Sequence, residues 1–460
     1  KRFQIVVDKF PQTEAAKFAS NLILDDMLAR KDWKSAAEYA ARLQTSKVGG
    51  DENALAIAKI KGGAEFEIAK DTLEQGRKLV ADGKIQEGDA LLESGAEQYL
   101  NLVAEDPHRE FADSMVYNAA LSLEAARRPL KAAALYERLY REYPKSEHAP
   151  EAMYRVALKN EQAFNFDKAV ETYLGLVKQY PKTEQAANAQ VNAGLALEGA
   201  QKYDQAAKEL ERYATLFPDK PDAADVFFRA AVVYKKKKDA AGELDVLKRF
   251  VSRYESRQAQ IPKVIEAQAR EGELFDQLGK RAGATSAWQA CVKNFDRAKG
   301  SPIAATFAGK CAFNLAEQQF ASYAKIGITS HGAKTQLKEL EKKSTELVKL
   351  ENTFKSVITT YKAAEWSLAS LYRIGALYDN LQQVVLKSPC PDDIKRQFGD
   401  AGCDEYRNAV EDKASVLEQK AVDAYKIAYD KATELHVTND WTKKTLASLN
   451  LLRPQDYPID

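Results

Sequence analysis

The stretch YPKTEQAANAQ, residues 180–190, decides the fold, because a close copy of it, YPKSEHAPEAM, occupies residues 143–153. Prolines recur at the same 37-residue interval as these two copies. At the next interval Glu255 replaces the proline, but the aromatic residue that precedes it, Tyr254, is kept. A landmark at a constant period predicts a chain built from stacked copies of one structural unit. The prolines in phase are Pro107, Pro144, Pro181 and Pro218.

Each unit is predicted to be a pair of antiparallel helices. In residues 169–180, AVETYLGLVKQY, apolar residues recur at helical spacing and share one face. The proline ends one helix and suits the first turn of the next, where Thr183 and Ser146 are the expected N-caps. The apolar face of such a hairpin is covered only by the next hairpin, which predicts an all-α solenoid.

The pattern resembles the tetratricopeptide repeat family. In that family a small residue in the first helix, an Ala and an aromatic residue in the second, and a closing Pro recur in every unit. Here Gly194, Ala169, Tyr173 and Pro181 fill these roles, although the 37-residue period is longer than the family's usual 34. The resemblance implies a right-handed superhelical solenoid of antiparallel helical hairpins. One unit earlier, the second-helix roles fall to Ala132, Tyr136 and Pro144.

The Tyr-Pro-x-Ser/Thr-Glu-x-Ala junction is similar to that of bacterial envelope members of the family. These include the outer-membrane assembly lipoprotein, Tol-Pal-associated proteins and periplasmic gliding-motility proteins. The resemblance implies a periplasmic protein that binds other proteins or peptides of an envelope complex.

The sequence predicts four successive parts. Residues 1–107 hold divergent hairpins and begin within a repeat, so the natural protein is expected to continue upstream. Residues 108–255 hold the regular 37-residue repeats, and residues 256–361 hold divergent hairpins of long helices. Residues 362–460 hold a last hairpin with a cysteine-bracketed insertion and a C-terminal cap.

Composition and motifs argue against several function classes. The 68 Lys and Arg residues balance 67 Asp and Glu residues, so no overall field favours nucleic acid or an anionic membrane. No stretch has the roughly 18 apolar residues that a membrane-spanning helix needs. The four histidines are scattered, and no phosphate-binding loop or nucleophile motif occurs. We therefore expect no enzymatic activity, no metal and no cofactor.

The four cysteines form two candidate disulfides. Cys390 and Cys403 bracket the insertion, and Cys291 and Cys311 lie in successive helices. An even number so arranged is typical of an oxidising compartment such as the periplasm. The alternative is two buried thiols at Cys291 and Cys311 and an ordinary pair of loop cysteines in a cytosolic protein. Neither pair has the short spacing of a zinc site.

The candidate partner-binding groove lies on the first helix of each hairpin, which in the family lines the concave face. Three residues before the small position, the units carry aromatic side chains except at Val191, and four residues after it they carry glutamates until Lys235. Such anchors suit a peptide or helix laid along a groove. The alternative is that the aromatic side chains only pack on the neighbouring helix and the glutamates are solvated. The candidates are Tyr117, Tyr154, Phe228 and Tyr372, with Glu124, Glu161 and Glu198.

The function that these observations favour is a non-enzymatic scaffold in a bacterial periplasmic or envelope-spanning complex, with gliding motility as the specific expectation from the resemblance. Two alternatives remain. One is a structural spacer whose groove stays empty. The other is a regulatory partner of an outer-membrane assembly or cell-wall enzyme system.

Overall fold

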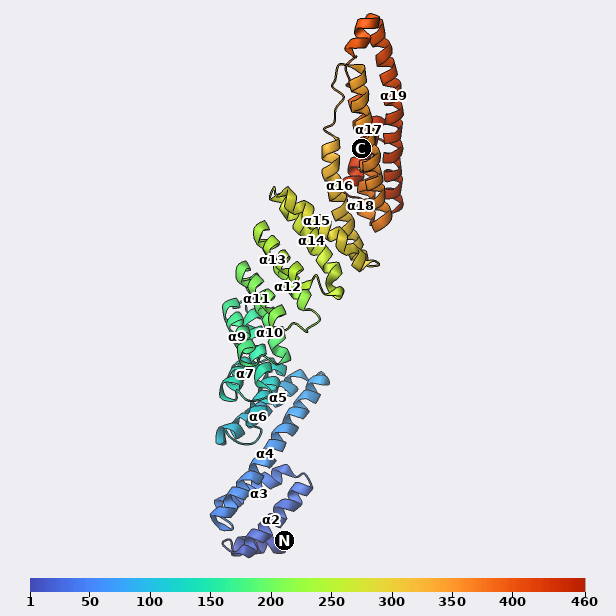
Figure 1. The fold of residues 1–460 in the computed structure, drawn as a ribbon. Coiled ribbons are helices and arrows are strands. Elements are labelled where there is room, and N and C mark those ends of the chain that lie inside the picture. Colours follow the sequence, from blue (N-terminus) through green and yellow to red (C-terminus); the bar gives the residue numbers. More distant parts are fainter. Residues whose placement is uncertain (460) are drawn as a thin grey trace. The chain divides into compact units, whose positions relative to one another are not determined.

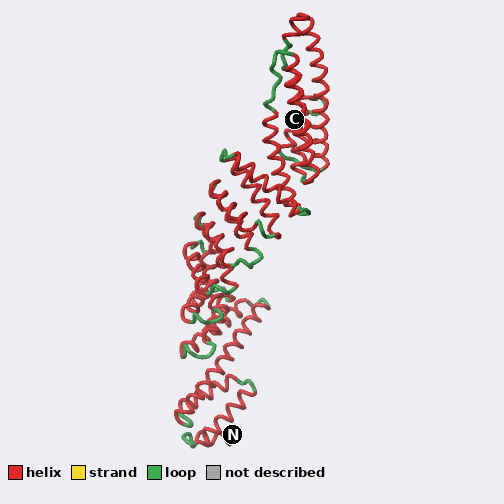
Figure 2. Tube along the Cα trace, in the orientation of Figure 1, coloured by secondary structure: helices red, strands yellow, loops and turns green. Residues whose placement is uncertain are grey.

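The computed structural model describes residues 1–459, which contain twenty α-helices, two short 3-10 helices and no strand. Figure 2 shows the helices following one another through loops. Consecutive helices pack on each other as hairpins, and first helices of neighbouring hairpins also touch, so the predicted all-α solenoid is confirmed. The chain divides into two compact units, residues 1–218 and 219–460 (Figure 1). In the described residues no helix is long and apolar enough to cross a membrane.

The N-terminal unit consists of a short first helix followed by five hairpins. Its helices are α1 (Arg2–Lys9), α2 (Glu14–Ala29), α3 (Trp33–Thr45), α4 (Gly50–Ala81), α5 (Ile85–Glu105), α6 (Ala112–Ala125), α7 (Pro129–Glu142), α8 (Ala149–Gln162), α9 (Phe166–Gln179), α10 (Glu184–Gly199) and α11 (Tyr203–Leu216).

The C-terminal unit begins with two hairpins of similar helix length and continues with much longer helices. Its α-helices are α12 (Ala223–Lys237), α13 (Ala240–Tyr254), α14 (Ile261–Gln277), α15 (Arg281–Phe295), α16 (Pro302–Tyr323), α17 (Ala333–Tyr361), α18 (Ala364–Leu386), α19 (Asp392–Glu434) and α20 (Asp440–Leu452).

The aromatic-proline junction connects two of the repeats to the repeats before them. The Tyr180 hydroxyl donates a hydrogen bond to the carbonyl oxygen of Pro144 at 3.0 Å, and Tyr143 donates to that of Pro107 at the same distance. These bonds cross 36 positions of sequence, close to one period. The aromatic landmark therefore holds successive junctions together, while the proline ends the preceding helix.

The helix start after each junction differs between the two copies of the opening phrase. Thr183 is the N-cap of α10, and its hydroxyl accepts a hydrogen bond from the Ala186 amide, as predicted. The prediction that Ser146 caps α8 is wrong, because the N-cap is His148. The Ser146 hydroxyl instead accepts the His148 amide at 3.2 Å, because Pro150 in the first turn sets a later helix start.

Small residues allow the two helices of a hairpin to approach closely. A Cβ atom on Gly194 of α10 would lie 2.8 Å from the side chain of Leu210 on α11, which is tighter than side chains tolerate. Ala169 and Ala206, the small residues of the second helices, are fully buried. These positions explain why the sequence keeps a small residue in phase, since a larger side chain would push the helices apart.

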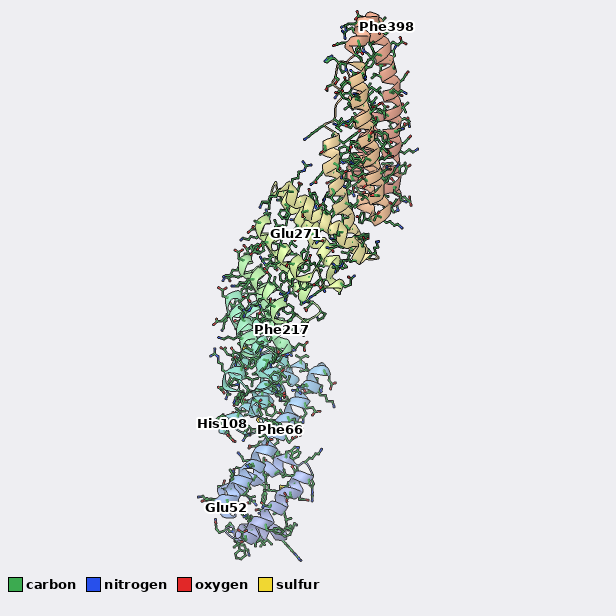
Figure 3. The ribbon with its side chains drawn as sticks, viewed as in Figure 1. Glu52, Phe66, His108, Phe217, Glu271 and Phe398 are labelled. Carbon is green, nitrogen blue, oxygen red and sulfur yellow. A yellow bond between two sulfur atoms is a disulfide. The ribbon has the colours of Figure 1, made fainter. Side chains whose placement is uncertain are left out.

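The predicted insertion before the last second helix is itself helical. It forms the start of α19, a 43-residue helix interrupted only at Gly399, which has a φ of 66°. A side chain with a Cβ disfavours this conformation, so glycine is suited to the bend. Phe398, beside the bend, lies at the end of the long helices and is 59% exposed (Figure 3).

A buried lysine fixes the loop that connects α16 and α17. Lys343 is completely buried and donates hydrogen bonds to the carbonyl oxygens of Tyr323 and Ile326 and to the side chain of Asn380. Burial lowers the pKa of Lys343 to about 8. Its three acceptors lie on different segments, so this one side chain joins the end of α16, the following loop and α18 to α17.

Candidate functional site

Two predicted groove aromatics lie in the N-terminal unit, and both are half-buried. Tyr117 stacks on the ring of His148, with 4.3 Å between ring centroids and 2° between ring planes. Tyr154 tilts against Tyr173 at 5.7 Å, and its hydroxyl accepts a hydrogen bond from Asn192 at 2.9 Å. Each ring thus packs on aromatic groups of the repeats and stays partly exposed.

The other two predicted aromatics lie in the C-terminal unit and are also half-buried. Phe228 meets Phe250 edge-on at 5.3 Å, and the Lys263 ammonium lies 5.5 Å from the Phe228 ring centroid. Tyr372 lies 5.5 Å from Tyr425 and 5.7 Å from Trp441. Each of these aromatic positions therefore combines packing on a neighbouring helix with a partly open ring surface.

The predicted glutamates accept hydrogen bonds from tyrosines of the second helices. Tyr136 donates to Glu124 at 3.1 Å, and Tyr173 donates to Glu161 at 2.8 Å, in both cases across 12 positions of sequence. Both tyrosine rings are fully buried, and burial raises their pKa values. In the third repeat Leu210 takes the tyrosine position, so this bond to Glu198 cannot form.

Two cations of the next repeat neutralise Glu124. Arg155 lies 2.8 Å and Lys159 lies 3.1 Å from its carboxylate oxygens. Partial burial favours a higher pKa for Glu124, but the hydrogen bond from Lys159 and the charge of Arg155 outweigh it and lower that pKa. Sequence reasoning missed these cations, although they stand 31 and 35 positions after Glu124, close to one period. An unneutralised acidic stripe is therefore not present at this repeat.

A buried carboxyl group lies in the first helix of a later hairpin. Glu271 on α14 is only 7% exposed, and its Oε1 atom has no hydrogen-bond partner among the described residues (Figure 3). Burial raises its pKa to about 7, and Glu255 adds to the shift while Lys248 opposes it. Glu271 therefore gains or loses a proton near neutral pH, although sequence reasoning did not single it out.

The structure joins both predicted cysteine pairs as disulfides. Cys291 on α15 is bonded to Cys311 on α16, with 6.4 Å between their Cα atoms. Cys390, just before α19, is bonded to Cys403 within α19, with 5.6 Å between their Cα atoms. Both Cα separations are normal for a disulfide. Within residues 1–459, no group of three or more His, Cys, Asp or Glu side chains is arranged to hold a metal ion.

The repeat geometry agrees with a family model. The model of the tetratricopeptide repeat matches residues 117–184, 160–221 and 191–257 in overlapping registers. Residues 117–257 match the tetratricopeptide repeat model. The matched segment runs from within α6 to the end of α13, so it includes six of the seven predicted groove residues, all but Tyr372.

Several solved structures are similar to parts of the chain, while a search of curated protein sequences gives no match. A tetratricopeptide repeat protein from Parabacteroides merdae shares 15% identity over 64% of this chain and 96% of its own, with a TM-score of 0.29. The C-terminal part of one from Cytophaga hutchinsonii shares 14% over 60% and 98%, with a TM-score of 0.31. MamA from Desulfovibrio magneticus shares 15% over 41% and 97%, with a TM-score of 0.26.

Proposed function

We propose that the chain is a non-enzymatic scaffold that binds other proteins or peptides in a bacterial periplasmic or envelope-spanning complex. The observation that carries the proposal is that first helices of both units carry half-buried aromatic rings, Tyr117 and Tyr154 in the N-terminal unit and Phe228 and Tyr372 in the C-terminal unit. Rigid aromatic groups with one packed edge and one open edge are common anchors of protein interfaces. The charged network around Glu124 would give such an interface directional polar contacts.

The periplasmic part of the proposal is supported by the two disulfides. Disulfides persist in oxidising compartments and are rare in the reducing cytosol. Among envelope machines, the junction phrase of the repeats resembles that of gliding-motility proteins, and we propose that class of complex first. Outer-membrane assembly and cell-wall enzyme regulation are the next candidates on the same resemblance.

One alternative function is favoured by a specific observation. Glu124 and Glu161 already accept hydrogen bonds inside the repeats, as expected if the stack is a spacer and its groove stays empty. A spacer would need these bonds for rigidity and would show no partner at the aromatic rings.

Site-specific photo-cross-linking distinguishes a scaffold from a spacer. The photoreactive residue p-benzoylphenylalanine would replace Tyr154 in one variant and Leu130 in another, in cells that produce the chain. The replacement keeps an aromatic ring at position 154 without the hydroxyl that bonds Asn192, and Leu130 on a second helix is 86% exposed and serves as the control. A discrete protein adduct at position 154 and not at 130 is expected. Absence of adducts at position 154, and in matching variants at positions 117, 228 and 372, would support the spacer.

Thiol labelling tests the compartment independently of partners. Chain recovered from cells in the presence of an alkylating reagent is expected to carry no label without reductant and four labels after reduction under denaturing conditions. Intact mass spectrometry gives the count. Four labels without reductant would contradict a periplasmic location.

A further inference from the structure

An apolar groove lies between α17 and α19 in the C-terminal unit, outside the tetratricopeptide repeats. The helix α18 packs along both of these helices, whereas α17 and α19 contact each other at few points (Figure 1). A cavity of about 500 Å³ lies between α17 and α19, and α18 forms its floor. Its walls include Leu337 and Leu340 of α17, Leu381 of α18, and Val410, Val416 and Leu417 of α19.

The groove exposes apolar side chains that no described segment covers. Leu337 is 55% and Val416 is 57% exposed, and they stand on opposite walls. Lining residues on α17 extend from Ala333 to Ser344, and those on α19 beyond its bend extend from Tyr406 to Leu417, with Ile394 before the bend. Twelve helical residues span about 18 Å, so the groove has the length of about three helical turns.

One end of the groove is held rigid by polar contacts. Gln336 donates to the carbonyl oxygens of Ser330 and Pro389, both at 2.7 Å, and accepts the Tyr406 hydroxyl at 3.0 Å. Ser388 bonds the same Tyr406 hydroxyl at 2.8 Å, and the Cys390–Cys403 disulfide lies beside it. A groove that is already ordered loses little conformational freedom when it binds a ligand.

The chemistry of the walls favours a helix over an extended peptide. The walls are helices whose own backbone groups are hydrogen bonded, and Gln336, Ser388 and Tyr406 already bond one another or nearby carbonyls. An extended peptide would bury unpaired backbone amides and carbonyls here, which costs free energy. A helix satisfies its own backbone and presents apolar side chains at intervals of three and four residues.

Charges on the two rims differ in sign. On α19, Glu405 and Asp412 are exposed and stand seven residues apart, on the outer side of Val416. On α17, the exposed residues on the outer side of Leu337 are Lys334, Lys338 and Glu341, so this rim has a net positive charge. Lys413 projects between the α19 rim and the apolar floor. A ligand helix with one acidic and one basic flank would match both rims, and the match would set its direction.

We infer that the α17–α19 groove binds an amphipathic helix of another protein, about three turns long, with an apolar stripe between an acidic and a basic flank. This inference rests on the proposed scaffold function and gives it a second interface. It differs from the aromatic surface of the tetratricopeptide repeats in position, in shape and in the kind of ligand.

A defined probe tests the inference. The probe is a hydrocarbon-stapled 14-residue helix with leucines at three- and four-residue intervals, glutamates on one flank and lysines on the other. Fluorescence polarisation with the full, oxidised chain is expected to show saturable binding. Val416→Glu is expected to weaken it at least tenfold, because the carboxylate enters an apolar wall. Ile303→Glu on α16, 58% exposed in the same unit, is the matched control and should leave affinity unchanged.

Two comparison peptides test the flanks. Stapled helices with lysine on both flanks or glutamate on both flanks are expected to bind several-fold more weakly than the probe. Equal affinity for all three peptides, no saturable binding, or no effect of Val416→Glu would overturn the inference. Self-association that Val416→Glu abolishes, seen by analytical ultracentrifugation, would overturn it in favour of a second copy. If the groove inference fails but photo-adducts at position 154 persist in the Val416→Glu variant, the proposed scaffold function is still supported.

Discussion

Single tyrosine hydroxyls connect the two helices of a repeat and connect one repeat to the next. Tyr173→Phe removes the hydrogen bond to Glu161 from a fully buried ring. We expect the N-terminal unit to lose about 1–3 kcal/mol of unfolding free energy, since the carboxylate loses its donor. Urea unfolding, with hydrogen–deuterium exchange of α8 and α9, measures the loss.

A second tyrosine in the same helix pair is the matched control for this prediction. The Tyr180 hydroxyl bonds the Pro144 carbonyl at the surface, where water can replace it. Tyr180→Phe should therefore cost about 0.5 kcal/mol or less. Equal losses for the two variants would contradict a special role of the buried bond.

The buried carboxyl of Glu271 makes stability depend on pH. Its folded pKa of about 7 is above its ordinary value, so its contribution to stability is complete below pH 4.5 and is lost as pH rises through 7. A shift of this size corresponds to about 3 kcal/mol at most. Glu271→Gln, which cannot ionise, should remove this pH dependence, as measured by urea unfolding at pH 5 and pH 8. An equal change between the two pH values in both proteins would refute the assignment.

At the scale of the element, local signals fix where helices begin. Thr183 caps α10 through the Ala186 amide. Thr183→Ala should destabilise the N-terminal unit by about 1 kcal/mol, because one amide of the first turn loses its acceptor. Thr359→Ala is the control, since that exposed hydroxyl bonds carbonyls of its own helix and caps nothing. Thermal unfolding by circular dichroism compares them, and a similar fall in both would reject the cap as the cause.

Longer elements depend on contacts that the repeat period does not describe. The helix α17 has 29 residues and α19 has 43, and neither follows the 37-residue phase. Lys343 anchors the first half of α17, and the Cys390–Cys403 disulfide ties the first part of α19 to the segment before it. The exposed apolar residues of the groove between them are a consequence of this departure from the hairpin stack.

At the scale of the whole molecule, the two compact units differ in their cross-links. Both disulfides lie in the C-terminal unit, and residues 1–218 contain no cysteine. Reduction should therefore lower the stability of the C-terminal unit by about 2–4 kcal/mol per disulfide and leave the N-terminal unit unchanged. Hydrogen–deuterium exchange with and without reductant resolves the two units, and faster exchange in α6 to α11 on reduction would contradict this independence.

The sequence by itself determined the helical hairpins. The spacing of apolar residues, the in-phase prolines and caps such as Thr183 act over a few residues, so the chain's local order predicts them. The sequence pattern also predicted that Cys291 and Cys311 lie on successive helices, and the structure joins these two cysteines in a disulfide. Ser146 shows the limit, because a nearby proline moved the start of α8.

Only the tertiary structure decided which surfaces are open and which charges are neutralised. Arg155 reaches Glu124 from the next repeat, and α17 and α19 form a groove although some 70 residues of sequence separate their facing walls. The partner-binding roles of Tyr117, Tyr154, Phe228, Tyr372, Glu124, Glu161 and Glu198 remain predictions. The physical reason is that exposure and ion pairing depend on distances between segments remote in sequence, whereas helix formation depends on neighbours along the chain.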